Sequence, residues 1–137
     1  MNKGVGQEPI QLNSLPNIRA RILFLGYNTC ETQIINTLID SGYEVWHTAS
    51  PISNTTGYDF VISFGYRHIL KKTIIQSSLA PIINLHISYL PYNRGAHPNF
   101  WSFFDNTPKG VSIHLMDEGI NTVTRICRFS KYRRHFF

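Results

Sequence analysis

Three polar residues alternate with apolar ones along a short stretch in the second half of the chain: Asn84, His86 and Ser88. The stretch continues an apolar run that is typical of a buried strand. Because successive side chains of a strand point to opposite faces, the three polar groups are expected to share one face. Pro91 then ends the strand, since proline cannot donate a ladder hydrogen bond. An amide and an imidazole two residues apart at the carboxyl end of a strand indicate a reaction site.

The elements that must position this stretch alternate between strands and helices. Apolar runs predict strands at 21–25, 43–48, 60–64, 82–86 and 111–116. Helical spacing predicts helices from Asn28 to Gly42, over 70–79 and in a short turn from Pro98. This order predicts an α/β fold, a Rossmann-like and mostly parallel sheet flanked by helices, with the site at the carboxyl ends of the strands.

Composition and charge narrow the class of protein further. The 137 residues suffice for one domain with a core, and no run of about 18 apolar residues predicts a membrane span. Cys30 and Cys127 lie far apart in no metal-type spacing, so we expect reduced thiols, a cytoplasmic location and no bound metal. The net charge of +5 lies entirely after residue 121, so it does not indicate a nucleic-acid surface on the fold.

We expect three segments along the chain. Residues 1–18 are polar with several Gly and Pro residues and are predicted to be a flexible leader. Residues 19–122 hold the predicted α/β domain. Residues 123–137 form a basic tail in which we expect no further strand.

Two blocks of sequence, at residues 84–101 and 108–122, resemble the folate-dependent formyltransferases. The first reads Asn-Leu-His-Ile-Ser-Tyr-Leu-Pro and continues through Arg-Gly-Ala-His-Pro to Trp101. The second reads Pro-Lys-Gly-Val-Ser-Ile-His-Leu-Met-Asp-Glu-Gly-Ile-Asn-Thr and is similar to the family's Gly-Val-Thr-Ile-His strand with the loop after it. The resemblance covers Arg21 to about Thr122 and implies the N-terminal catalytic domain of that family in a truncated chain.

The resemblance implies transfer of a formyl group from 10-formyltetrahydrofolate to an amine, with an amino-sugar nucleotide as the expected acceptor. Asn84 and His86 fall on the family's catalytic Asn and His, and Asn121 stands where the family has a catalytic Asp. A fixed amide donor and a protonated imidazole suit this chemistry, because each such donor stabilises a developing oxyanion by roughly 3–4 kcal/mol. Ser88, Arg94 and His114 are the expected substrate contacts.

A fainter similarity places the folate site in the loop after the third predicted strand. The residues expected to contact the cofactor are Tyr66, His68, Ile69 and Leu70. In the family, the backbone of this loop contacts the pterin. The alternative is an ordinary strand-to-helix turn with no ligand.

Several alternatives stay open. An amide at Asn121 cannot ionise, so it cannot act as a base, which favours a catalytically impaired remnant or a binding module. Val123-Thr124 in place of the family's Gly-Asp pair suggests out-of-frame translation as one origin of the tail. A second possible function is that of a methionyl-tRNA formyltransferase, with methionyl-tRNA as the acceptor. A third is that of a small nucleic-acid-binding protein that uses the tail. The alternative for His86 is a purely structural role. The histidines could also form a zinc site, made by His86, His97 and His114.

Overall fold

A computed structural model of the protein describes residues 6–86, 110–116 and 126–130, the last of these as backbone. The chain divides into two compact units, Met1–Ile83 and Asn84–Phe137. Within the described residues, no helix has the length and apolar character that crossing a membrane requires.

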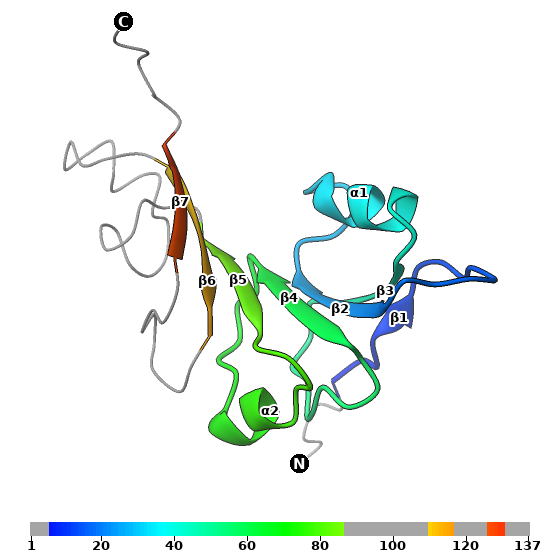
Figure 1. Ribbon diagram of the computed structural model, residues 1–137. Coiled ribbons are helices and arrows are strands. Elements are labelled where there is room, and N and C mark those ends of the chain that lie inside the picture. The colour runs from blue at the N-terminus through cyan, green and yellow to red at the C-terminus, as the bar shows by residue number, and fades with distance from the viewer. Residues whose placement is uncertain (1–5, 87–109, 117–125, 131–137) are drawn as a thin grey trace, which may run out of the picture. The chain divides into compact units, whose positions relative to one another are not determined.

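The first unit contains a four-stranded part of the sheet with the order β1-β3-β2-β4. Its strands are β1 (Ile10–Gln11), β2 (Arg21–Gly26), β3 (Glu44–Thr48) and β4 (Phe60–Phe64). The central strand β2 runs parallel to both β3 and β4, whereas β1 is antiparallel to β3. Helix α1 (Ile34–Asp40) connects β2 to β3, and α2 (Lys72–Gln76) follows β4 on the other side of the strands (Figure 1). The predicted α/β architecture is thereby confirmed.

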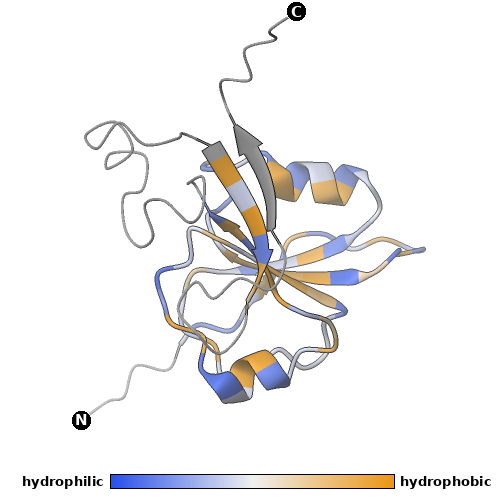
Figure 2. Cartoon of the chain, turned by 60° about the vertical axis from the view of Figure 1, so that its left-hand side comes forward, coloured by the Kyte–Doolittle hydropathy of each residue, from blue (hydrophilic) through white to orange (hydrophobic). Residues whose placement is uncertain are grey.

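The core of this unit forms where α1 packs on the sheet. Phe24, Ile35 and Val45 are fully buried against one another. Leu23 and Leu25 alternate with Phe24 along β2 and are also fully buried, so this central strand is covered on both faces. Figure 2 shows the consequence, because the strands are largely hydrophobic whereas each helix carries both polar and apolar residues.

Helix α1 begins later than the capping pattern predicted. The Asn28 side chain accepts hydrogen bonds from the backbone N–H groups of Cys30 and Glu31, and the Glu31 carboxylate accepts one from the Asn28 N–H. This is the reciprocal geometry of a capping box. It closes a single turn, however, and the regular helix starts at Ile34 after Gln33. The predicted end is confirmed, because Gly42 has φ +89° and its N–H bonds to the Ile39 carbonyl.

Part of the expected leader belongs to the sheet. Ile10 and Gln11 of β1 pair with His47 and Trp46 of β3. The Asn13 side chain then clamps the segment, since its Oδ1 accepts from the Val45 N–H at 2.8 Å and its Nδ2 donates to the Tyr43 carbonyl at 2.9 Å. The antiparallel strand covers the otherwise open edge of β3.

The second unit contains most of β5 (Ile83–His86), β6 (Gly110–Leu115) and β7 (Ile126–Ser130). In the strand order, β6 lies between β5 and β7. β6 and β7 are antiparallel, with Ile113 opposite Cys127. The expectation that no strand follows residue 122 is therefore wrong. The tail was expected because five of the residues after 122 are basic, whereas the ladder to β6 forms through backbone groups.

Candidate active site

The carboxyl ends of β2 and β4 meet at two glycines. Gly26 has φ +109° and Gly65 has φ +68°, a region that residues with a side chain rarely adopt. A Cβ at Gly26 would overlap the Phe64 carbonyl oxygen, and one at Gly65 would overlap the Tyr27 ring. The Tyr27 N–H donates to the Phe64 carbonyl at 2.8 Å and joins the two loops. The glycines thus allow the backbones to approach closely at the carboxyl ends of the strands, where the site was predicted.

The loop after β4 holds the four residues predicted to bind folate. Tyr66 anchors its start, since the hydroxyl donates to the Ser50 carbonyl at 2.9 Å. Leu70 anchors its end and is 6% exposed, whereas Ile69 is 79% exposed. The His68 ring lies edge-on to that of Tyr66, with centroids 5.3 Å apart. The loop is therefore fixed at both ends and presents an apolar side chain to solvent between them.

Partial burial raises the pKa of Tyr66 above its ordinary value of 10.0, and a backbone hydrogen bond at Ile52 acts in the opposite direction. The hydroxyl therefore keeps the proton that it donates to Ser50 throughout the neutral range.

His47 is a residue of this edge that the sequence patterns did not single out. Its Nε2 donates to the Gly26 carbonyl at 2.9 Å, which places a β3 side chain under the turn after β2. The one signal in the sequence was its position near the end of a predicted strand. Because its role follows from pairing between strands, the local pattern could not identify it.

In the second unit, the structure brings together two of the predicted site residues. The Nδ2 of Asn84, on β5, lies 2.9 Å from the Nε2 of His114, on β6. The His114 Nδ1 lies 3.2 Å from the Leu115 carbonyl oxygen. His114 is 3% exposed and Ser112, two residues earlier on the same strand, is fully buried. His86 is half-buried and follows Asn84 at the spacing that shares one face of β5.

The partners of His114 determine the protonation of its ring. A carbonyl oxygen only accepts hydrogen bonds, so Nδ1 carries the proton that points at Leu115. The amide nitrogen of Asn84 only donates, so Nε2 is the acceptor. In the Nδ1–H tautomer, both ring nitrogens are therefore engaged by the protein.

Three predicted site residues lie outside the described part of the chain: Ser88, Arg94 and Asn121. Their roles stay predictions.

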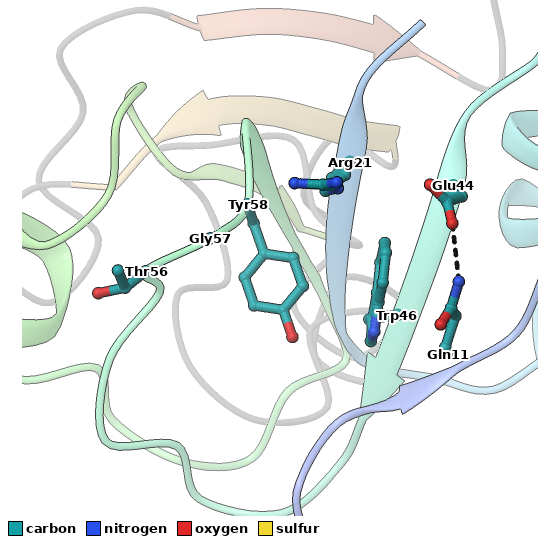
Figure 3. Close-up of a pocket in the computed structure, with 7 residues that line it drawn as sticks. All are labelled: Gln11, Arg21, Glu44, Trp46, Thr56, Gly57 and Tyr58. Atoms are coloured by element: carbon teal, nitrogen blue, oxygen red, sulfur yellow. Dashed lines mark hydrogen bonds between the residues drawn. The ribbon is translucent and has the colours of Figure 1, made fainter. Parts of the chain in front are cut away.

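A hollow of about 380 Å³ lies elsewhere on the first unit (Figure 3). It is lined by Gln11, Arg21, Glu44, Trp46, Thr56, Gly57 and Tyr58. Arg21 and Glu44 are the first residues of β2 and β3, so the hollow belongs to the amino ends of the strands. The Glu44 carboxylate accepts from the Gln11 amide at 2.7 Å, and Trp46 and Tyr58 meet edge to face. None of the predicted site residues lines it.

Comparison with known proteins agrees with the resemblance. A family model described as "Formyl transferase" matches residues 49–127, which is more than half of the chain. A methionyl-tRNA formyltransferase of Nitratiruptor sp. is 44% identical over 81 residues, covering 58% of this chain and 24% of that protein. Its counterpart from Sorangium cellulosum is 29% identical over 108 residues, covering 78% of this chain and 32% of its own length. The chain thus spans about a quarter to a third of these curated relatives.

Solved structures show the same fold. The formyltransferase PseJ from Anoxybacillus kamchatkensis, in complex with UDP-4,6-dideoxy-4-formamido-L-AltNAc and tetrahydrofolate, matches with TM-score 0.67 and 36% identity. The match covers 82% of this chain and 61% of that one. A 4-N formyltransferase from Francisella tularensis shares the fold with TM-score 0.64 at 22% identity, covering 81% of this chain and 57% of that one. With the family match over its strands β5 and β6, the chain belongs to the formyl transferase family. Its described part is a portion of the family's N-terminal domain.

Proposed function

We propose that this chain is the folate-binding and catalytic part of a formyltransferase that moves a formyl group from 10-formyltetrahydrofolate to an amine. The observation that carries the proposal is the Asn84 amide, held at 2.9 Å by the buried His114 within the family-matched region. A half-buried, oriented amide is the kind of donor that acyl transfer requires.

The loop after β4 fits a folate. Folate carries a flat, partly apolar ring, and the loop offers the exposed Ile69 beside the aromatic rings of Tyr66 and His68. Leu70 is buried in the core, so only its backbone is free to contact a ligand. When bound, the folate supplies the formyl group.

The proposed reaction involves Asn84, His86 and the position of Asn121. The acceptor nitrogen forms a bond to the formyl carbon, the bond from that carbon to the donor nitrogen breaks, and a proton passes from the acceptor to the leaving nitrogen. Asn84 donates to the formyl oxygen while it carries negative charge. His86 donates to the same oxygen or carries the proton. Asn121 occupies the position of the family's catalytic Asp and cannot take up a proton as a carboxylate would.

For the acceptor, we propose an amino-sugar nucleotide in the cytoplasm. Support comes from PseJ, which is 36% identical and was solved with a formamido-sugar nucleotide. Methionyl-tRNA is the second candidate, because the Nitratiruptor relative is 44% identical over a shorter span. A catalytically impaired binding module is the candidate from another class, and Asn121 favours it.

Calorimetry separates the two candidate acceptors. The chain is titrated with tetrahydrofolate, and then, with the folate site filled, with an amino-sugar nucleotide or with methionyl-tRNA. We expect saturable folate binding, followed by binding of the sugar nucleotide. Binding of tRNA alone would transfer the assignment to the second candidate, and a folded chain that binds no folate would overturn the proposal.

A further inference from the structure

Strand β6 buries polar side chains and exposes an apolar one, which is the reverse of the usual pattern of a sheet strand. Ser112 and His114 are 0% and 3% exposed, whereas the apolar Val111 is 38% exposed. Burying a polar group without a hydrogen bond is unfavourable, so polar residues on a buried face indicate a specific task. For His114 the bonded partner is Asn84.

Neither nitrogen of the His114 ring is left for a substrate. Nε2 accepts from Asn84, and Nδ1 donates to the carbonyl of the neighbouring Leu115. A direct contact between His114 and the amine substrate would require one of these hydrogen bonds to break inside a buried site. The geometry therefore does not favour the substrate contact that the sequence predicted for His114.

The same two bonds fix the Asn84 amide. An amide can rotate so that either its oxygen or its nitrogen faces a partner. In a neutral ring, the Nδ1 bond to Leu115 leaves Nε2 as an acceptor, and an acceptor selects the NH₂ end of Asn84. The amide nitrogen carries two N–H groups, and His114 takes one of them. The second N–H is thereby given a set direction as a donor.

We infer that His114 is a positioning residue, which holds the Asn84 amide with its NH₂ end oriented as a hydrogen-bond donor for the reaction. The catalytic part of this inference rests on the proposed function, formyl transfer with Asn84 as a donor. Its structural content, the neutral Nδ1–H tautomer bonded to the amide, does not depend on any substrate.

A double-mutant cycle tests the inference. Replacing His114 by leucine removes the acceptor in a side chain of similar size, and we expect kcat to fall by about 10- to 100-fold with little change in KM, because the donor is misplaced. His114→Gln keeps an acceptor near the position of Nε2 and should restore most of kcat. In an Asn84→Ala background, His114→Leu should change kcat by less than about twofold, because no amide remains to be positioned.

A matched control separates positioning from stability. Ile113→Ala removes side-chain packing on the same strand from the alternate face, so it should lower the free energy of unfolding and leave kcat unchanged. If His114 were purely structural, His114→Leu would lower the free energy of unfolding and would change kcat by the same factor in the presence and absence of Asn84. That result would overturn the inference.

Nuclear magnetic resonance decides the matter even where a variant does not fold or no acceptor is turned over. In the unmodified chain, the ring ¹⁵N shifts of His114 should report a protonated Nδ1 and an unprotonated Nε2 at neutral pH. The Asn84 side-chain amide protons should shift in His114→Gln. An Nε2–H tautomer would contradict the inference, whereas a wild-type chain that transfers no formyl group would contradict only the proposed function.

Discussion

The backbone of Gly65 lies against the ring of Tyr27, with no room for a Cβ atom between them. Gly65 begins the loop proposed to bind folate, and Tyr27 begins the loop after the central strand. The two residues follow paired strand ends, since Gly26 of β2 lies opposite Phe64 of β4. The contact makes the conformation of the proposed folate loop dependent on a residue with no side chain.

Replacing Gly65 by alanine should destabilise the chain and weaken folate binding. The positive φ alone costs about 1–3 kcal/mol, and displacement of the Tyr27 ring adds to it. Gly57→Ala is the matched control, because Gly57 also has a positive φ, +94°, but nothing lies within 4 Å of the place that its Cβ would take. Urea unfolding of the two variants measures the difference. Equal losses would show that the Tyr27 contact contributes nothing.

The hydroxyl of Ser77 should contribute more to the free energy of unfolding than the hydroxyl of its neighbour Ser78. Ser77 Oγ accepts from the N–H of the fully buried Thr55 at 3.0 Å and donates to the Ile74 carbonyl at 2.7 Å. Ser77→Ala leaves the Thr55 N–H without this partner, which costs about 1–3 kcal/mol. Ser78 Oγ only donates to the Ala80 carbonyl, so Ser78→Ala should cost about 1 kcal/mol or less. A larger loss in Ser78→Ala, measured by thermal unfolding, would refute this explanation of how the end of α2 is joined to the loop before β4.

Stability should fall at alkaline pH in part through Tyr66. Burial raises the pKa of Tyr66 above 10.0, so the folded chain holds this proton when the unfolded chain has released it. The contribution is fully present below about pH 10 and is lost as the pH rises through the folded pKa. Tyr66→Phe should lower stability near neutrality by about 1 kcal/mol, through loss of the bond to Ser50, and should flatten the alkaline decline.

Urea midpoints measured between about pH 8 and pH 11 test this expectation. The pKa of Tyr58 is also raised, by burial and then by the charge of Glu8, but Tyr58 is present in both chains and cancels in the comparison. Parallel pH profiles for the wild type and Tyr66→Phe would show that Tyr66 makes no such contribution.

Asn121→Asp should increase turnover if the chain is an active transferase that lacks only its base. A carboxylate at this position can accept the proton that the amine loses, whereas an amide cannot. An effect of about 10²- to 10⁴-fold is expected for a well-placed base, measured as formamide product from 10-formyltetrahydrofolate. Asp105→Asn, at a position to which we assign no role, is the control for the change in charge. An unchanged rate would mean that Asn121 does not occupy the base position.

Much of the fold could be predicted because local patterns determine it. The apolar run that became β2 is covered on both faces, that of β4 is buried on one face, and Gly42 ended α1 as expected. The start of α1 was misplaced because the Asn28–Glu31 capping box closed a separate turn. β1 was missed because its antiparallel partner β3 is distant in sequence, and β7 was missed because its basic surroundings were interpreted as a tail.

In the candidate site, too, local patterns predicted some features, whereas others depend on the pairing of strands. Spacing alone placed Asn84 and His86 on one strand and Ser112 and His114 on another. The bond between Asn84 and His114 could not be predicted, because it depends on the register of β5 against β6. The sequence therefore predicted candidate residues for the site, and the structure added the contact between Asn84 and His114 on which the positioning role is proposed.

Single-turnover formyl transfer from 10-formyltetrahydrofolate to an amino-sugar nucleotide, compared between the wild-type chain and Asn84→Ala, would decide whether Asn84 is the donor to the formyl oxygen. We predict a formamido product and free tetrahydrofolate from the wild type. We also predict a rate about 10²- to 10³-fold lower in Asn84→Ala, with unchanged folate affinity. Equal rates in the two chains, or no transfer by a folded wild-type chain to either class of acceptor, would contradict the proposed function.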